Sequence, residues 1–267
     1  QMPAVWRLRW NDPTVLFGIV CVLLPVVRGG DPALLLQYFQ EPSLLIGLCA
    51  AVGVVWVAKR GGDEKLEAWE VRAATWYLLN GFLFHYAFDF CVPILNAVPM
   101  LRATYTEMDG RYGCVPHIRC QGKLGVSKPI DPTIWVVCHL EAMLDTPLCF
   151  VIFVAYLKGW AVRRPLEIML AGMQITGTVI FQGTELYHGL RNTPPAPHNV
   201  GGKGGMLQHA SLDPWGDWAR FECQVLFFWF AFCVLNSVWY AVPARLAWAA
   251  ATEVARGGVG ARTRMAD

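Results

Sequence analysis

The sequence predicts an all-α protein, a multi-pass integral membrane bundle of five or six transmembrane helices. The 267 residues are 55% hydrophobic and only 16% charged, whereas a soluble domain carries roughly 25% charged residues. Apolar runs recur along the chain, and the longer ones approach or exceed the roughly 17–25 residues that a spanning helix needs. The net charge of +2 favours neither nucleic acid nor an acidic substrate as a partner.

Five apolar runs are long enough to be the predicted spans once their flanks are counted. They are Ser43–Ala58, Val71–Pro99, Ile134–Leu157, Pro165–Tyr187 and Phe221–Trp248. The shorter run Val15–Val27 forms either a sixth helix or a segment in the membrane interface. Glu41-Pro42 interrupts the apolar stretch between Leu34 and the first confident span.

Three regions follow from these runs. Residues 1–42 form an N-terminal segment with a short apolar or membrane helix, residues 43–250 form the helix bundle, and residues 251–267 form a tail. Basic residues gather at 59–65, at 158–164 and in the tail, all on one side of a five-helix arrangement. The positive-inside rule places that side, and with it the C-terminus, in the cytosol.

Two long connections, Leu101–Thr133 and His188–Arg220, then face the lumen. Both are rich in glycine and proline, which favours loops over additional helices. The first contains Cys114 and Cys120, which form a disulfide if the loop lies in an oxidising lumen, or stay free. The nine cysteines show no zinc-type spacing.

The most informative span carries His85 and Asp89 within an almost wholly apolar run. Ionisable groups at the bilayer centre cost at least about 2.5–3.5 kcal/mol, so their default interpretation is functional. At i and i+4 the two side chains share one helix face, where a carboxylate orients an imidazole. The alternative is a polar pair that only locks helix packing.

The third span repeats this pattern with Glu141 and Asp145, again at i and i+4. Two neighbouring carboxyl groups do not both ionise easily, so one retains a proton that it can donate. The alternative is that one of them caps a helix or pairs with a basic residue at the membrane edge. We therefore predict four catalytic residues: His85, Asp89, Glu141 and Asp145.

Polar and aromatic residues in the last two spans complete the candidate site. Gln174, Thr178 and Gln182 follow one another at i, i+4 and i+8, which predicts a polar seam inside the bundle. Asn236 and Trp239 share a face of the last helix. Aromatic faces serve packing more often than a site, but beside buried acids they also stabilise cations. This combination predicts carbocation chemistry that needs no metal and no other cofactor.

At these residues the chain resembles the EXPERA-domain family, whose members include emopamil-binding protein (the sterol Δ8–Δ7 isomerase) and the sigma-two receptor. The resemblance runs from about Glu67 to Arg245. The isomerase pattern G-F-x-H-x-x-x-E is similar to Gly81–Asp89, with one inserted residue and Asp in place of Glu. The family's Y-x-x-x-D-x-R-Y segment is present as Tyr105, Asp109, Arg111 and Tyr112.

Two more family motifs occur in the expected order. Q-I-x-G corresponds to residues 174–177, and F-W-F…N-x-x-W…P corresponds to residues 228–230 with Asn236, Trp239 and Pro243. Three positions depart from the isomerase: Asp89 is one methylene shorter than glutamate, Glu141 lies one turn beyond the expected acid, and Thr178 replaces aspartate. The resemblance implies these substrate-binding residues: Tyr105, Asp109, Arg111, Tyr112, Gln174, Thr178, Trp229, Asn236 and Trp239.

Three functions are open at this point. The first is a terpenoid or meroterpenoid cyclase, in which an acid protonates an isoprenoid alkene or epoxide and the cation closes rings; the displaced acids favour it. The second is a sterol Δ8–Δ7 isomerase. The third is a sterol-binding protein without turnover, like the sigma-two receptor. The resemblance further implies an endoplasmic reticulum membrane location, contact with membrane lipid, a lipophilic isoprenoid or sterol substrate, and a homodimer.

Overall fold

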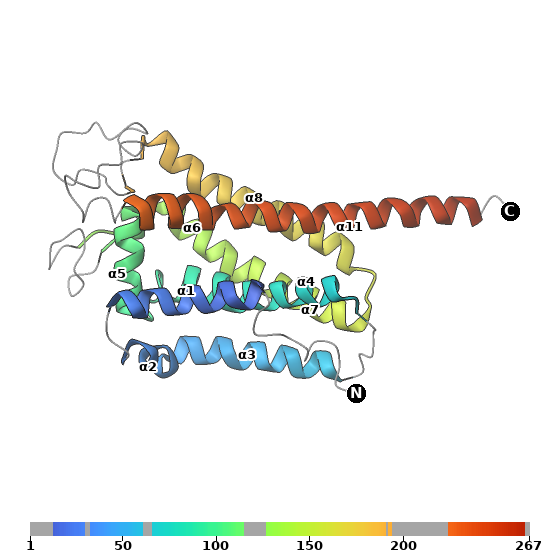
Figure 1. Cartoon of the computed structure of the whole chain (residues 1–267), viewed down its shortest axis with the longest axis horizontal. Coiled ribbons are helices and arrows are strands. Elements are labelled where there is room, and N and C mark those ends of the chain that lie inside the picture. Colours follow the sequence, from blue (N-terminus) through green and yellow to red (C-terminus); the bar gives the residue numbers. More distant parts are fainter. Residues whose placement is uncertain are drawn as a thin grey trace.

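The computed structural model describes residues 13–29, 33–60, 66–114, 127–190, 192–193 and 224–264. Figure 1 shows long helices running side by side along the longest axis of the molecule. Within the described residues the chain is helical apart from turns and one isolated β-bridge between Cys114 and Lys128. The all-α prediction is therefore confirmed.

The N-terminal region contains α1 (Pro13–Gly29), α2 (Ala33–Gln40) and α3 (Pro42–Lys59). Glu41 has extended backbone angles and Pro42 takes the first turn of α3, where its missing N–H costs nothing. The expected break between α2 and α3 is therefore present. Phe17 of α1 packs on Phe84 and Trp239 with ring centroids 5.2 Å and 6.1 Å away, so α1 belongs to the packed bundle.

The next long helix begins as α4 (Ala68–Leu79) and continues as the π-helical segment η2 (Asn80–Cys91). A reciprocal capping box between Glu67 and Glu70 begins α4. At the other end, the Val92 N–H donates to the Ala87 carbonyl, five residues back, at 3.1 Å. Pro93 follows and has no N–H with which to continue the helix, so the helix ends before the predicted limit at Pro99.

The third long helix combines α6 (Pro132–Leu140), the π-helical turn η4 (Glu141–Asp145) and α7 (Thr146–Lys158). Pro147 explains the π-helical turn, because its ring would collide with the carbonyl four residues earlier in a regular α-helix. The Thr146 N–H bonds instead to the Glu141 carbonyl, one residue further back. The helix ends at Gly159, whose φ of 62° is left-handed.

The last two long helices are α8 (Arg163–Tyr187) and the continuous pair η5 (Gln224–Leu235) and α11 (Asn236–Arg264). Figure 1 shows α11 beside α8 and extending beyond the ends of the other helices. The Gln182 amide donates to the Phe232 carbonyl at 2.8 Å, and the Asn236 amide to the Ala231 carbonyl at 3.0 Å. Side-chain amides thus satisfy backbone groups where the helix is π-wound.

One expected loop is partly helical. Residues 99–108 form α5 (Pro99–Met108), followed by the short 3-10 turn η3 (Gly110–Tyr112). Pro99 starts α5 at a position that tolerates proline, and Leu101 and Thr106 bury one of its faces. Figure 1 shows α5 lying across one end of the long helices. The prediction of a loop was wrong for residues 99–108. The glycines and prolines of this connection favoured a loop, but these ten residues form an amphipathic helix with one buried face. Most of residues 188–220 and Cys120 lie outside the described residues.

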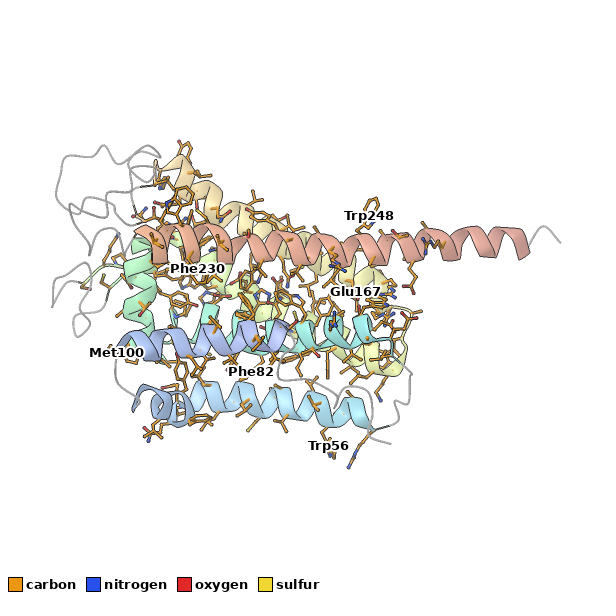
Figure 2. All side chains as sticks on the ribbon, viewed as in Figure 1. Trp56, Phe82, Met100, Glu167, Phe230 and Trp248 are labelled. Atoms are coloured by element: carbon orange, nitrogen blue, oxygen red, sulfur yellow. The ribbon has the colours of Figure 1, made fainter. Side chains whose placement is uncertain are left out.

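At the opposite end of α8, a network of charged groups joins three helices. Arg164 contacts Glu167 at 2.9 Å and also pairs with Glu253 of α11. Glu167 is 1% exposed and accepts a hydrogen bond from Tyr156. Figure 2 shows Glu167 within the bundle, whereas Trp248 and Trp56 point away from it.

Two described helices are long and apolar enough to cross a membrane: Pro132–Lys158 and the stretch Phe228–Arg256. The apolar helix Pro42–Ala58 is shorter. Many large apolar side chains on the outer faces are exposed, including Ile46, Val52 and Met143. The long apolar helices and the exposed apolar side chains fit a protein whose outer surface contacts lipid.

The helix containing η2 and the helix containing η4 meet closely at Gly81. Thr146 Oγ1 donates to the Gly81 carbonyl at 3.1 Å. A Cβ on residue 81 would lie 2.8 Å from Cys149 Cβ and 3.2 Å from the Thr146 carbonyl oxygen. Glycine is therefore required for this approach, and the approach positions the two helices that carry the predicted catalytic residues.

We expect Gly81→Ala to lower the thermal unfolding midpoint of the detergent-solubilised protein, because overpacking costs about 1–3 kcal/mol. Gly172→Ala is the matched control, since nothing lies within 4 Å of its added carbon and alanine favours a helix. Its midpoint should equal or exceed that of the unmodified protein. Equal midpoints for Gly81→Ala and the unmodified protein would contradict the close helix contact.

Candidate functional site

The four residues predicted to be catalytic lie in one cluster around the imidazole of His85. Its Nδ1 atom is 3.9 Å from Asp89 Oδ2 and 3.9 Å from Glu141 Oε1. Its Nε2 atom is 3.9 Å from Asp145 Oδ2. The imidazole is 1% exposed, so it joins three carboxyl groups from η2 and η4 through a ring that bulk water does not reach.

Two side-chain amides hold the other edge of the imidazole. Asn80 Nδ2 and Gln174 Nε2 each lie 3.0 Å from His85 Nε2. Amide NH₂ groups donate, so in this arrangement Nε2 carries the lone pair and Nδ1 carries the proton. The Nδ1–H therefore faces Asp89 and Glu141. Gln174 was predicted as a site residue, and its α8 position brings it into the cluster.

Asn80 is a site residue that the sequence reasoning missed. It precedes His85 by five residues, and in an α-helix such side chains point about 140° apart. The π-helical winding of η2 reduces this offset because its i→i+5 turns are wider than α-helical turns. An asparagine inside an apolar run was the signal that could have identified it. Its contact with His85, however, depends on π-helical winding, and α-helical spacing does not predict that contact.

The cluster has an accessible side and a closed side. The side chains of Asp89 and Glu141 are 24% and 22% exposed, whereas that of Asp145 is 6% exposed. His85 Nδ1 and Asp145 Oδ1 are buried without a hydrogen-bond partner. A reacting molecule would thus meet Asp89 and Glu141, with His85 behind them and Asp145 behind the ring.

The charge balance of the cluster is unusual for a buried site. Among the described residues, no lysine or arginine lies within 4.0 Å of Asp89, Glu141 or Asp145; their ionic partner is His85. Isolated buried charges are costly, which favours sharing protons among the members. The ligand atoms of His85, Asp89 and Glu141 also lie within 4.8 Å of one another, a spacing that admits a metal ion.

Asp109 and Arg111 form a second buried network at the α5 end of the bundle. Arg111 Nη2 contacts Asp109 Oδ2 at 2.6 Å, and its Nε contacts Glu185 Oε2 at 3.3 Å. Arg111 Nη1 donates to the Phe181 carbonyl and to Thr184 Oγ1, at 2.9 Å and 2.7 Å. Asp109 and Glu185 are fully buried. These contacts hold η3 against α8. Asp109 and Arg111, both predicted to contact substrate, therefore position these two elements.

Glu185 is a residue that the sequence reasoning did not assign to any site. It accepts hydrogen bonds from the backbone and side chain of Asn192, at 2.6 Å and 2.8 Å, in addition to facing Arg111. Tyr105 and Tyr112 stack edge to face at 5.0 Å beside this network, and Tyr112 also packs on Phe181. Nothing in the spacing along the chain predicted that Glu185 completes this network.

The remaining predicted site residues lie in different surroundings. Trp239 packs edge-on against Phe84 at 5.3 Å. Thr178 is buried, but its hydroxyl donates to the Gln174 carbonyl of its own helix. Asn236 bonds to its own helix, as described above, and Trp229 is 42% exposed. Trp239 therefore packs against Phe84, the residue directly before His85. Trp229 is exposed instead of packed against the cluster.

The fold and the site define a class: all-helical proteins with membrane-length apolar helices and a buried histidine–carboxylate cluster. A sequence model of the family described as EXPERA (EXPanded EBP superfamily) matches residues 126–250. That segment belongs to the EXPERA family, which confirms the resemblance drawn from the motifs. It contains Glu141, Asp145 and Gln174, whereas His85 and Asp89 precede it. The family and the apolar helices together indicate a membrane protein. The comparison with curated proteins finds no match.

We expect Arg111→Met to destabilise the protein strongly, because it leaves the carboxylates of Asp109 and Glu185 buried without their cation. Breaking a buried ion pair in this way costs about 3–5 kcal/mol. Lys128→Met is the control, since the lysine makes a single half-buried contact with the Gly110 carbonyl at 3.1 Å. Urea or thermal unfolding in detergent measures both; similar losses for the two variants would contradict the network.

Proposed function

We propose that the chain is a membrane-embedded enzyme that moves a carbon–carbon double bond in a sterol-like isoprenoid by acid-initiated carbocation chemistry. The observation that carries the proposal is the compactness of the cluster, in which two accessible carboxyl groups face one imidazole nitrogen. A double-bond shift adds a proton to one carbon and removes a proton from a carbon two bonds away. An acid and a base within a few ångströms of each other suit such a shift.

The proposed cycle conserves protons. Glu141, holding a proton, donates it to one alkene carbon, and the C=C electron pair forms the new C–H bond and leaves a tertiary cation. Asp89, as carboxylate, removes a proton from the carbon on the other side of the cation, and that C–H pair becomes the new double bond. His85 returns the proton from Asp89 to Glu141. No step in this cycle calls for a metal.

The depth of the cluster suits an apolar substrate. Arg164 and Glu185, which belong to the ionic networks at the two ends of α8, are separated by 21 residues, or about 32 Å of helix. The hydrocarbon core of a bilayer is about 30 Å thick. Gln174 lies near the midpoint, so the cluster would lie near the bilayer centre. We extend this to five or six spans in the endoplasmic reticulum membrane, with the C-terminus cytosolic; a homodimer remains a prediction.

Terpenoid or meroterpenoid cyclisation is the second candidate. The group of aromatic rings formed by Phe17, Trp76, Phe84 and Trp239 favours it, with ring centroids 5.2–6.3 Å apart. Such rings stabilise cations. Cyclisation of a long chain, however, removes its final proton far from the carbon first protonated, and the compact cluster suits that separation less well.

The first experiment is a product assay on microsomes that contain the expressed chain. A Δ8 sterol is supplied in one reaction, and a farnesylated phenol or its epoxide in the other; products are identified by mass spectrometry and NMR. We expect a Δ7 sterol. New rings on the prenylated substrate, with the sterol unchanged, would replace the isomerase by the cyclase. Unchanged substrates in both reactions would contradict enzymatic turnover and favour a sterol-binding protein.

We expect Glu141→Gln to reduce turnover by about 10²–10⁴, the usual contribution of a general acid, while the affinity for a non-reacting sterol analogue changes little. Glutamine keeps the size and hydrogen-bonding oxygen but holds no transferable proton. Glu41→Gln, at the start of α3 and outside the cluster and both charged networks, is the matched control and should retain activity. A Glu141→Gln enzyme with unchanged turnover would show that another group supplies the proton.

A further inference from the structure

We propose that His85, Asp89 and Glu141 bind one divalent transition-metal ion of the Zn²⁺ type, and that the bound ion blocks the proton transfers of the proposed function. The ion is an inhibitor at this site rather than a cofactor of the reaction. Binding is independent of the proposed reaction, whereas the inhibition rests on it.

The spacing of the three donor atoms suits such an ion after a small contraction. His85 Nδ1 is 3.9 Å from each carboxylate oxygen, and all three donors lie within 4.8 Å of one another. A point equidistant from atoms so separated is about 2.5 Å from each, compared with about 2.0–2.2 Å for zinc ligands. Small side-chain rotations of Asp89 and Glu141, which are partly exposed, would bring their oxygens to the usual zinc–ligand distance.

The unpaired nitrogen of His85 is an independent indication of a missing partner. Nδ1 is buried, has no hydrogen-bond partner, and belongs to a side chain that is 1% exposed. Buried polar atoms are nearly always bonded. Nδ1 lies between the two carboxylates, and once the ring proton has moved to Nε2 its lone pair could bind a cation together with both oxygens.

The two carboxylates favour an ion of charge +2, and the imidazole nitrogen favours a transition metal over Mg²⁺. Two carboxylates without a neighbouring lysine or arginine among the described residues balance the charge of one M²⁺ ion. Imidazole nitrogen favours Zn²⁺ and related ions, whereas Mg²⁺ demands oxygen ligands in octahedral geometry and keeps its waters. We therefore expect Zn²⁺ to bind and Mg²⁺ to bind at least about a hundredfold more weakly.

The second layer of side chains can support the metal-bound imidazole. Coordination through Nδ1 requires its lone pair, so the ring proton moves to Nε2 and needs an acceptor. Asn80 Oδ1 is buried without a partner, and a half-turn of that amide would present it to Nε2–H. The Gln174 amide, whose NH₂ group faces the same nitrogen, would have to turn as well. Metal-bound histidines usually donate their second N–H in this way. Any protons on the two carboxyl groups leave to solvent.

The binding test uses the full chain, purified in detergent and treated with chelator, and isothermal titration with Zn²⁺ and with Mg²⁺. We expect one Zn²⁺ per chain, with affinity reduced at least about tenfold in His85→Ala, Asp89→Asn and Glu141→Gln. His139→Ala is the control, because His139 Nδ1 is bonded to the Trp135 carbonyl of its own helix. Its affinity for Zn²⁺ should equal that of the unmodified protein.

A second measurement needs no variant. Co²⁺ bound to nitrogen and oxygen donors gives visible d–d bands without the near-ultraviolet charge-transfer band of a cobalt–thiolate bond. A thiolate band, no stoichiometric Zn²⁺ binding, or an equal loss of affinity in His139→Ala and Asp89→Asn would overturn the site. If Zn²⁺ binds as expected and the product assay shows no turnover to inhibit, the proposed function fails while the metal site stands.

Discussion

The ring of Pro147 is the constraint on which the site depends. Because that ring would collide with the carbonyl four residues earlier in a regular α-helix, the preceding turn widens to η4, and this turn carries both Glu141 and Asp145. Pro93 has a comparable place after η2, which carries Asn80, His85 and Asp89. Two helices with wide turns face each other at the close contact around Gly81. π-helical segments occur frequently at functional sites, and here η2 brings Asn80 to His85, two side chains that a regular α-helix would point apart.

Charged networks at the two ends of α8 hold this arrangement in place. The network around Arg111 joins η3 to α8, and the network around Arg164 joins α7, α8 and α11. In each network an arginine pairs with at least two carboxylates, which offsets the cost of burying charge. The central cluster differs from both because its carboxyl groups have no lysine or arginine among the described residues. The ends are thus held by ion pairs with arginine, and the central carboxyl groups have only a histidine beside them.

The helices were predictable because apolar runs and proline positions are local signals. Three of the five expected spans match their helices closely, whereas the helix expected over Val71–Pro99 ends at Cys91 and the last helix continues beyond Trp248 to Arg264. The pairing of His85 with Asp89 followed from i, i+4 spacing. Asn80 was missed because its contact depends on π-helical winding, and Glu185 because its partners come from two segments distant in the sequence. Trp229 matched a motif, but a motif records residue type and order, not the direction in which a side chain points.

The pair of amides on His85 has a consequence for how fast the site can be reset. Asp89 and Glu141 both face Nδ1, whereas both amides face Nε2. In the proposed cycle a proton therefore passes between the two carboxyl groups through one nitrogen, while the other nitrogen keeps its hydrogen bonds. This requires no displacement of a helix, whose collective motions take microseconds to milliseconds. Resetting the site between turnovers would therefore need only small movements of two carboxyl groups.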